Sequence, residues 1–114
     1  MSLYLTCLAV TLLVEVSVAV VWSSAFARSR EHTKGILMLV VGINCLTHPL
    51  AWLTFGFFPG SLLLIEVAVI VVEALMLRCC GRQSWLAAIS LSSAMNLASL
   101  AAGLVPLMWW LSIN

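Results

Sequence analysis

Charged residues are scarce in this chain of 114 residues. Only 8% of the residues are Asp, Glu, Lys or Arg, while 64% are hydrophobic and the mean hydropathy is +1.20. Soluble domains carry about 25% charged residues. The composition therefore excludes an ordinary water-soluble fold, and it offers no basic surface of the kind that binds nucleic acid.

The chain also lacks a disulfide framework and a cysteine-based metal motif. Cys7 and Cys45 lie within long apolar runs, where a thiol serves as a small packing residue. Cys79 and Cys80 are adjacent, and no His or further Cys near them completes a metal site. None of the four cysteines therefore indicates catalysis or metal binding.

Four long apolar runs make up most of the chain, at about residues 3–27, 36–55, 61–77 and 85–113. At 1.5 Å per residue, each helix can cross about 30 Å of hydrocarbon, and the runs are too continuous for barrel strands. The sequence predicts a single all-α domain, an integral membrane four-helix bundle. Short connections predict an antiparallel up-down order. No internal repeat or low-complexity segment is evident.

Basic residues are missing from the middle connection, from the spans and from both termini. All five lie in the first and third connections: Arg28, Arg30, Lys34, Arg78 and Arg82. Positively charged loops remain in the cytoplasm. We therefore expect both basic connections to be cytoplasmic and the N and C termini to lie outside.

Three glutamates lie inside the apolar spans, although no Lys or Arg accompanies them: Glu15, Glu66 and Glu73. The eleven Leu, Ile and Val residues of the third span favour insertion by about 5 kcal/mol. Its two carboxylates oppose insertion by about 5–7 kcal/mol. The third span therefore needs partners that satisfy its glutamates.

The spacing of the polar residues predicts which of them face the same way. Glu66 and Glu73 are seven residues apart, which is about 20° from two full turns, so they share a helix face about 10 Å apart. Asn44 and His48, four residues apart, share a face of the second span. Counting from the middle of each span gives three tiers of depth: His48 with Glu66, Glu15 with Asn44, and Glu73 with Asn96. If all face inward, one polar column runs through the bundle.

The missing positive charge predicts a counter-cation. It is a proton, a divalent metal ion, a cationic substrate or a basic residue of another chain. A separation of about 10 Å prevents Glu66 and Glu73 from binding the same metal ion. Glu66 with His48 is the pair that we expect to bind a metal, if one is bound.

The fourth span carries small and amide side chains on one face: Ala88, Ser92, Asn96, Ser99 and Gly103. Small residues allow two membrane helices to approach closely, and Ser and Asn form hydrogen bonds across the contact. The pattern predicts a packing seam, and Asn96 with its serines is also a candidate lining of a polar site.

The stretch NCLTHPLAW (residues 44–52), with Glu15 before it and SAMNLAS (residues 93–99) after the paired glutamates, resembles a group of small four-span bacterial membrane proteins. The shared pattern is N-x-x-T-H-P, paired glutamates, then N-x-x-S. The resemblance implies a bacterial inner-membrane location but no particular activity. Length and Glu15 are also similar to the small multidrug-resistance transporters, which lack the extra glutamates and the Thr-His-Pro element.

Three functions are compatible with this polar column. The first is an oligomeric transporter or channel that moves protons or cations along it. The second is a non-catalytic subunit of a larger membrane complex, whose acids pair with a partner's basic residues or are buried as hydrogen bonds that only hold the helices together. The third, an intramembrane enzyme with His48 and Glu66 as an acid–base pair, lacks a nucleophile motif or phosphate loop.

Overall fold

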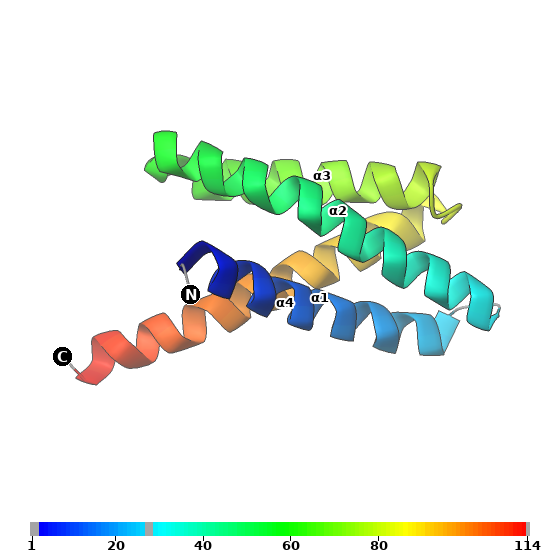
Figure 1. The fold of residues 1–114 in the computed structure, drawn as a ribbon, viewed down its shortest axis with the longest axis horizontal. Helices are drawn as coiled ribbons and strands as arrows, with labels where there is room; N and C mark the ends of the chain where they lie inside the picture. The colour runs from blue at the N-terminus through cyan, green and yellow to red at the C-terminus, as the bar shows by residue number, and fades with distance from the viewer. Residues whose placement is uncertain (1–2, 27–28, 114) are drawn as a thin grey trace.

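The structure, a computed structural model, describes residues 3–26 and 29–113, which form four α-helices and no strand (Figure 1). The helices are α1 (Leu3–Phe26), α2 (Arg30–Phe57), α3 (Leu62–Cys79) and α4 (Trp85–Ile113), with a short 3-10 turn at Pro59–Ser61 before α3. All four are long and apolar enough to cross a membrane. The predicted fold class, an all-α bundle of membrane-spanning helices, is confirmed.

Helix α2 begins at Arg30, six residues before the apolar run that predicted it. Ser29 is its N-cap, with an extended backbone and a hydroxyl oxygen that accepts the His32 backbone N–H at 3.2 Å. Glu31 lies in the first turn, where a negative charge favours the helix dipole. The first turn of α2 is therefore polar, and hydropathy alone misses it. Ala27 and Arg28 lie outside the described residues.

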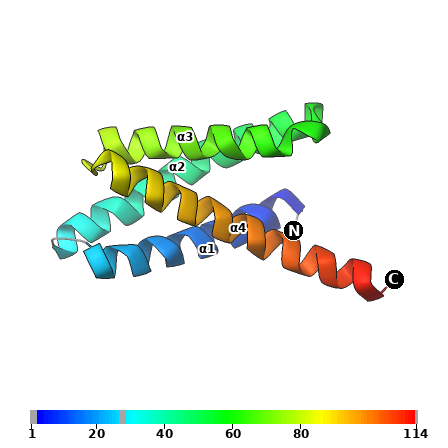
Figure 2. The same cartoon turned by 180° about the vertical axis from the view of Figure 1, so that it is seen from behind.

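The four helices form a closed ring. Each helix packs against the next one in the sequence, and α4 closes the ring by packing against α1. Helix α1 contacts α2 and α4, and α3 contacts the same two helices, whereas the described residues of diagonal pairs make no close backbone contact. Successive helices run in opposite directions, as predicted (Figures 1 and 2). Both ends of the described chain lie at the same end of the bundle as the α2–α3 turn, opposite the other two connections (Figure 1).

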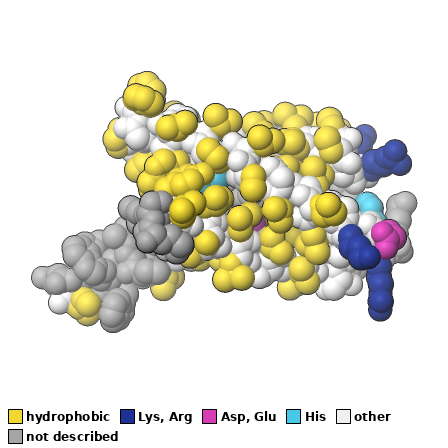
Figure 3. Space-filling model, in the orientation of Figure 1, with side chains coloured by type: hydrophobic (Ala, Val, Ile, Leu, Met, Phe, Trp, Pro, Cys, Tyr) yellow, Lys and Arg dark blue, Asp and Glu magenta, His cyan; other side chains and the backbone are white. Residues whose placement is uncertain are grey.

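The surface separates into apolar flanks and one charged end (Figure 3). The described basic residues all lie at or near the end that holds the α1–α2 and α3–α4 connections: Arg30, Lys34, Arg78 and Arg82. Large apolar side chains cover the flanks, as Met38 (77% exposed) and Leu63 (75%) illustrate. Soluble monomers rarely expose apolar surface on this scale, so the flanks are suited to lipid.

An apolar core fills the bundle from the charged end to about its middle. Its members come from all four helices and are almost fully buried: Ala19, Ile36, Val40, Ile43, Leu77, Ala88, Leu91 and Met95. Beyond this core, towards the end with the termini, most buried side chains are polar, with Ile65 as an apolar exception, while Ser23 is a buried polar residue near the charged end. The bundle is therefore packed shut at the charged end, and its polar interior begins near mid-depth.

Gly81 allows the chain to turn tightly between α3 and α4. A Cβ atom there would lie 2.7 Å from the Leu77 carbonyl oxygen and 3.1 Å from Cδ2 of Leu39. The same carbonyl accepts the Gln83 backbone N–H at 3.3 Å, so it is not free to move away. We expect Gly81→Ala to lower the free energy of unfolding by about 1–3 kcal/mol, the usual cost of overpacking.

Unfolding of the purified protein in detergent measures this loss. Gly42→Ala is the matched control, because a Cβ atom at Gly42 has no neighbour within 4 Å. Alanine is also the better helix former, so this control is expected to be neutral or slightly stabilising. Equal stability of the two variants would contradict the close approach at Gly81.

Candidate intramembrane binding site

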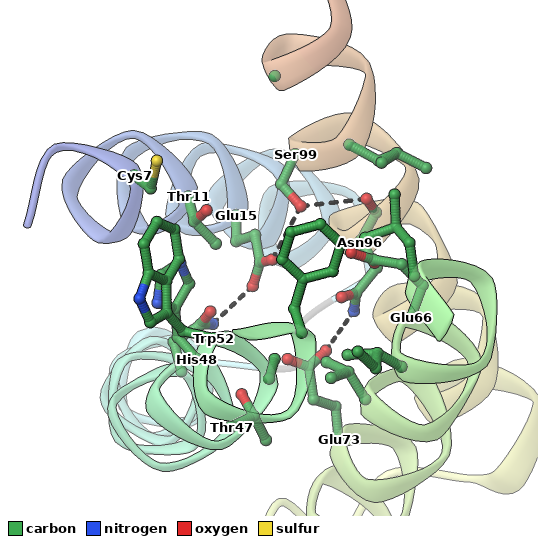
Figure 4. Close-up of a pocket in the computed structure, with 18 of the residues that line it drawn as sticks. Cys7, Thr11, Glu15, Thr47, His48, Trp52, Glu66, Glu73, Asn96 and Ser99 are labelled. Carbon is green, nitrogen blue, oxygen red and sulfur yellow. Dashed lines mark hydrogen bonds between the residues drawn. The ribbon is translucent and has the colours of Figure 1, made fainter. Parts of the chain in front are cut away.

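A cavity of about 320 Å³ lies between the four helices (Figure 4). At about 30 Å³ per molecule, it has room for about ten waters or a small ligand. All six residues of the predicted polar column line it: Glu15, Asn44, His48, Glu66, Glu73 and Asn96. The structure therefore places all six side chains around one interior cavity, as the sequence predicts.

Glu15 of α1 is held by donors from two other helices. Its Oε2 atom accepts a hydrogen bond from Nδ2 of Asn44, and its Oε1 atom accepts one from the Ser99 hydroxyl at 3.2 Å. Glu15 is 1% exposed. Both carboxyl oxygens are thus satisfied, and Glu15 lies beside Asn44, as the depth count predicts.

Glu73 of α3 is fully buried but only half satisfied. Its Oε2 atom accepts hydrogen bonds from Nδ2 of Asn96 and from the Ser92 hydroxyl, the latter at 3.2 Å. Its Oε1 atom is buried and has no hydrogen-bond partner among the described residues. A buried polar atom without a partner costs about 1–3 kcal/mol. Glu73 is therefore the place where the cavity most needs a ligand, water or proton.

The Tyr4 ring packs against both His48 and Trp52, two residues that line the cavity. The Tyr4 ring lies 5.5 Å from the His48 ring and 5.6 Å from the Trp52 ring, centroid to centroid. Nδ1 of His48 is buried without a partner in the described structure. Glu66 is half-buried and faces His48 from the other side of the cavity (Figure 4).

His48 and Glu66, the predicted metal-binding pair, thus line the same cavity but lie on opposite sides of it. Within residues 3–26 and 29–113, no three His, Cys, Asp or Glu side chains are grouped as metal ligands. A divalent metal held by His48 and Glu66 stays a prediction.

The cavity is strongly acidic in composition. Three carboxyl groups line it, and none of the lining residues is Lys or Arg. Glu15 and Glu73 lie close enough to repel each other when both are charged, and Glu66 adds to this repulsion. Burial also disfavours charged carboxylates. The lining therefore disfavours simultaneous charge on all three carboxyl groups and favours a cation among them.

The lining becomes more exposed away from the charged end of the bundle. Glu73 is 0% exposed and Asn96 4%, whereas Trp52 is 39% and Leu104 45% exposed. The acidic centre therefore lies at the more buried end of the cavity, next to the apolar core, and the more exposed lining residues lie towards the end where α2 meets α3.

The predicted packing seam of α4 divides between two roles. Ser99 and Gly103 line the cavity, while Ala88 and Ser92 are fully buried between helices. The Ser92 hydroxyl donates both to the Ile70 carbonyl oxygen, at 2.9 Å, and to Glu73. Small residues at this interface therefore also supply donors to the carboxyl groups.

Sequence reasoning did not place Thr11 and Thr47 in the polar column, although Thr47 belongs to the Asn-x-x-Thr-His-Pro pattern, and both line the cavity. The available signal for Thr47 is its position three residues after Asn44, which matches Ser99 three residues after Asn96. Comparison of the chain with protein-family models, curated proteins and solved structures finds no match. The resemblance based on the Asn-x-x-Thr-His-Pro pattern therefore stays a prediction.

Proposed function

We propose that this protein binds a proton or another small cation inside the membrane and carries it across the bilayer. The observation that supports this most directly is the composition of the cavity. It brings three carboxyl groups together at membrane depth and contains no basic side chain to neutralise them. Intramembrane acids are costly, and they typically mark ion or proton pathways.

Two further features favour a mobile cation over a purely structural hydrogen-bond network. A structural network satisfies its buried groups, but Oε1 of Glu73 and Nδ1 of His48 have no partners in the described structure. A network of this kind also needs no empty space, whereas this one borders a cavity of about 320 Å³. Both features support a small cation that enters and leaves the cavity.

The packed core indicates how passage is controlled. Val40, Leu77 and Leu91 are fully buried between the acidic centre and the charged end. A cation that enters from the open side reaches the carboxyl groups but not the opposite face. Transport then requires the hairpins to rearrange so that this core opens while the mouth closes, which is the alternating access used by many transporters.

The experiment is proton uptake by vesicles that contain the purified protein, driven by a potassium diffusion potential and read with an internal pH-sensitive dye. We expect uptake with the wild type and uptake at the level of protein-free vesicles with the Glu15→Gln/Glu73→Gln variant. Repeating the assay with sodium and potassium gradients separates protons from metal cations.

Glu31→Gln is the matched control, because Glu31 is an exposed carboxylate paired with Lys34 at 3.2 Å and lies outside the cavity. It removes one negative charge without touching the acidic centre, so its flux should equal that of the wild type. Undiminished flux in the double variant would contradict the proposal.

A non-catalytic role in a larger membrane complex is the second candidate. The same unpartnered Oε1 of Glu73 would accept a Lys or Arg from another chain that reached into the cavity. Purification from native membranes decides between the two. A stable assembly of this chain alone, with cation flux, excludes an obligatory partner, whereas constant co-purification of a second membrane protein favours the complex.

A further inference from the structure

The lining of the cavity follows an internal repeat that the sequence analysis does not recognise. Adding 58 to the number of a cavity residue in α1 gives a cavity residue in α3. The pairs are Cys7 with Ile65, Thr11 with Val69, and Glu15 with Glu73. These three pairs account for every residue that α1 contributes.

Helices α2 and α4 repeat in the same way, with an offset of 52. The pairs are Asn44 with Asn96, Thr47 with Ser99, His48 with Leu100, Ala51 with Gly103, and Trp52 with Leu104. These pairs include all the cavity residues of α4 and all but Phe55 of α2. The sequence shows no repeat of residue types along the two hairpins, as expected, and the likeness is confined to cavity positions, of which the Glu, Asn, Thr/Ser and Ala/Gly pairs hold similar residues.

The hydrogen bonds repeat with the residues. Nδ2 of Asn44 donates to Glu15 Oε2 and, at 3.1 Å, to the carbonyl oxygen four residues earlier in α2. Nδ2 of Asn96 donates to Glu73 Oε2 and, at 3.0 Å, to the carbonyl oxygen four residues earlier in α4. The α1–α2 hairpin and the α3–α4 hairpin thus build the same Glu–Asn unit, facing each other across the cavity.

One hydrogen bond breaks this symmetry. Besides the Asn96 carbonyl oxygen of its own helix, at 3.1 Å, the Ser99 hydroxyl also has Oε1 of Glu15 in the other hairpin as an acceptor, at 3.2 Å. The equivalent bond would join the Thr47 hydroxyl to Oε1 of Glu73. Instead, Thr47 donates to the Ile43 carbonyl oxygen at 3.0 Å, and Oε1 of Glu73 is without a partner. The two half-sites are therefore built from equivalent residues but differ in their hydrogen bonds.

We propose that Glu15 and Glu73 are equivalent half-sites for one shared proton or monovalent cation, and that Thr47 donates to Glu73 when the two half-sites exchange states. The transported species rests on the function proposed above, but the hydrogen-bond exchange does not. Thr47 is then a positioning residue that acts through Glu73. A change of rotamer is available to Thr47, because helical threonine divides between two χ1 rotamers, one of which bonds a preceding carbonyl.

The other two ionisable groups of the cavity, Glu66 and His48, have no ionisable counterpart in the opposite hairpin. Glu66 of α3 corresponds to Leu8 of α1, and His48 of α2 corresponds to Leu100 of α4, while α4 contributes no ionisable side chain. Both lie in the less buried part of the cavity, so in this proposal they act when the cation enters. The exchange of the cation takes place between the two Glu–Asn units.

Infrared difference spectra across a pH change test the exchange, because the C=O stretch of a protonated carboxyl group reports its hydrogen bonds without any measurement of flux. Glu15→Gln and Glu73→Gln assign the bands. We expect Thr47→Val, which keeps the shape but removes the hydroxyl, to shift the Glu73 band. It should also lower flux about tenfold, as loss of one hydrogen bond to a charged group does. Thr47→Ser should retain both properties.

Thr54→Val is the matched control. Its hydroxyl also donates to the carbonyl four residues earlier, at 2.7 Å, but it is exposed and outside the cavity. If Thr47→Val shifts the Glu73 band no more than Thr54→Val does, the proposed hydrogen-bond exchange at Glu73 is wrong. This holds even if the wild-type protein transports a cation. If the band shifts in a protein without flux, the exchange stands and the proposed transport fails. Ser99→Ala should shift the Glu15 band, which tests the other half-site independently.

Discussion

A membrane-impermeant maleimide should leave Cys79 and Cys80 unlabelled in intact cells and should label both once the membrane is permeabilised. Both thiols are exposed at the charged end of the bundle, next to Arg78 and Arg82. Basic connections stay in the cytoplasm, so this end is expected to face inward. The cavity mouth, at the opposite end, would then open to the outside.

Moving the basic residues should reverse this result. In a variant with all five basic residues replaced by glutamine and with Gly60→Lys and Ser61→Lys in the α2–α3 turn, we expect both thiols to react in intact cells. Charge bias is the main determinant of orientation in small membrane proteins, so the change should be close to all-or-none. Cys45 is exposed on the apolar flank and serves as an internal control, because lipid shields it from the reagent in either orientation. Labelling of intact wild-type cells at Cys79 would show that the orientation is wrong.

The four helices and the depth of their polar groups were predictable because hydrocarbon imposes simple rules. A helix rises a constant 1.5 Å per residue, so counting from the middle of each span placed Glu15 beside Asn44 and Glu73 beside Asn96. Burial of unpaired acids is costly, which made their inward orientation the only favourable choice. Both pairs are present as hydrogen bonds in the structure.

The partners and the repeat were harder to predict, for two physical reasons. Lipid-facing positions need only be apolar, so the two hairpins share few identical residues beyond the Glu and Asn of each unit. The offsets also differ, by 58 − 52 = 6 residues, because the chain from Glu73 to Asn96 is shorter than that from Glu15 to Asn44. A search at one fixed period therefore misses the repeat. The role of Ser99 escaped for a related reason: its acceptor, Glu15, is 84 residues away in sequence.

The largest effect on stability is expected from Asn96→Leu. This change removes the amide that donates to Glu73, and it leaves a fully buried carboxyl group with Ser92 as its remaining partner. A buried polar group that loses its partner costs about 1–3 kcal/mol, and the adjacent unpartnered Oε1 atom places Glu73 at the upper end of this range. We therefore expect the free energy of unfolding to fall by about 3 kcal/mol, measured by reversible denaturation in mixed micelles.

A double-mutant cycle shows whether this loss comes from the orphaned carboxyl group. Glu73→Leu alone should cost less than Asn96→Leu, because the Asn96 amide keeps its hydrogen bond to the Ser92 carbonyl oxygen at 3.0 Å. Combining the two changes should recover most of the stability lost in Asn96→Leu, since two apolar side chains need no partners. A simple sum of the two single losses would mean that Glu73 and Asn96 are not coupled. Recovery of stability together with loss of flux would show that the Glu–Asn unit is retained for function at a cost in stability.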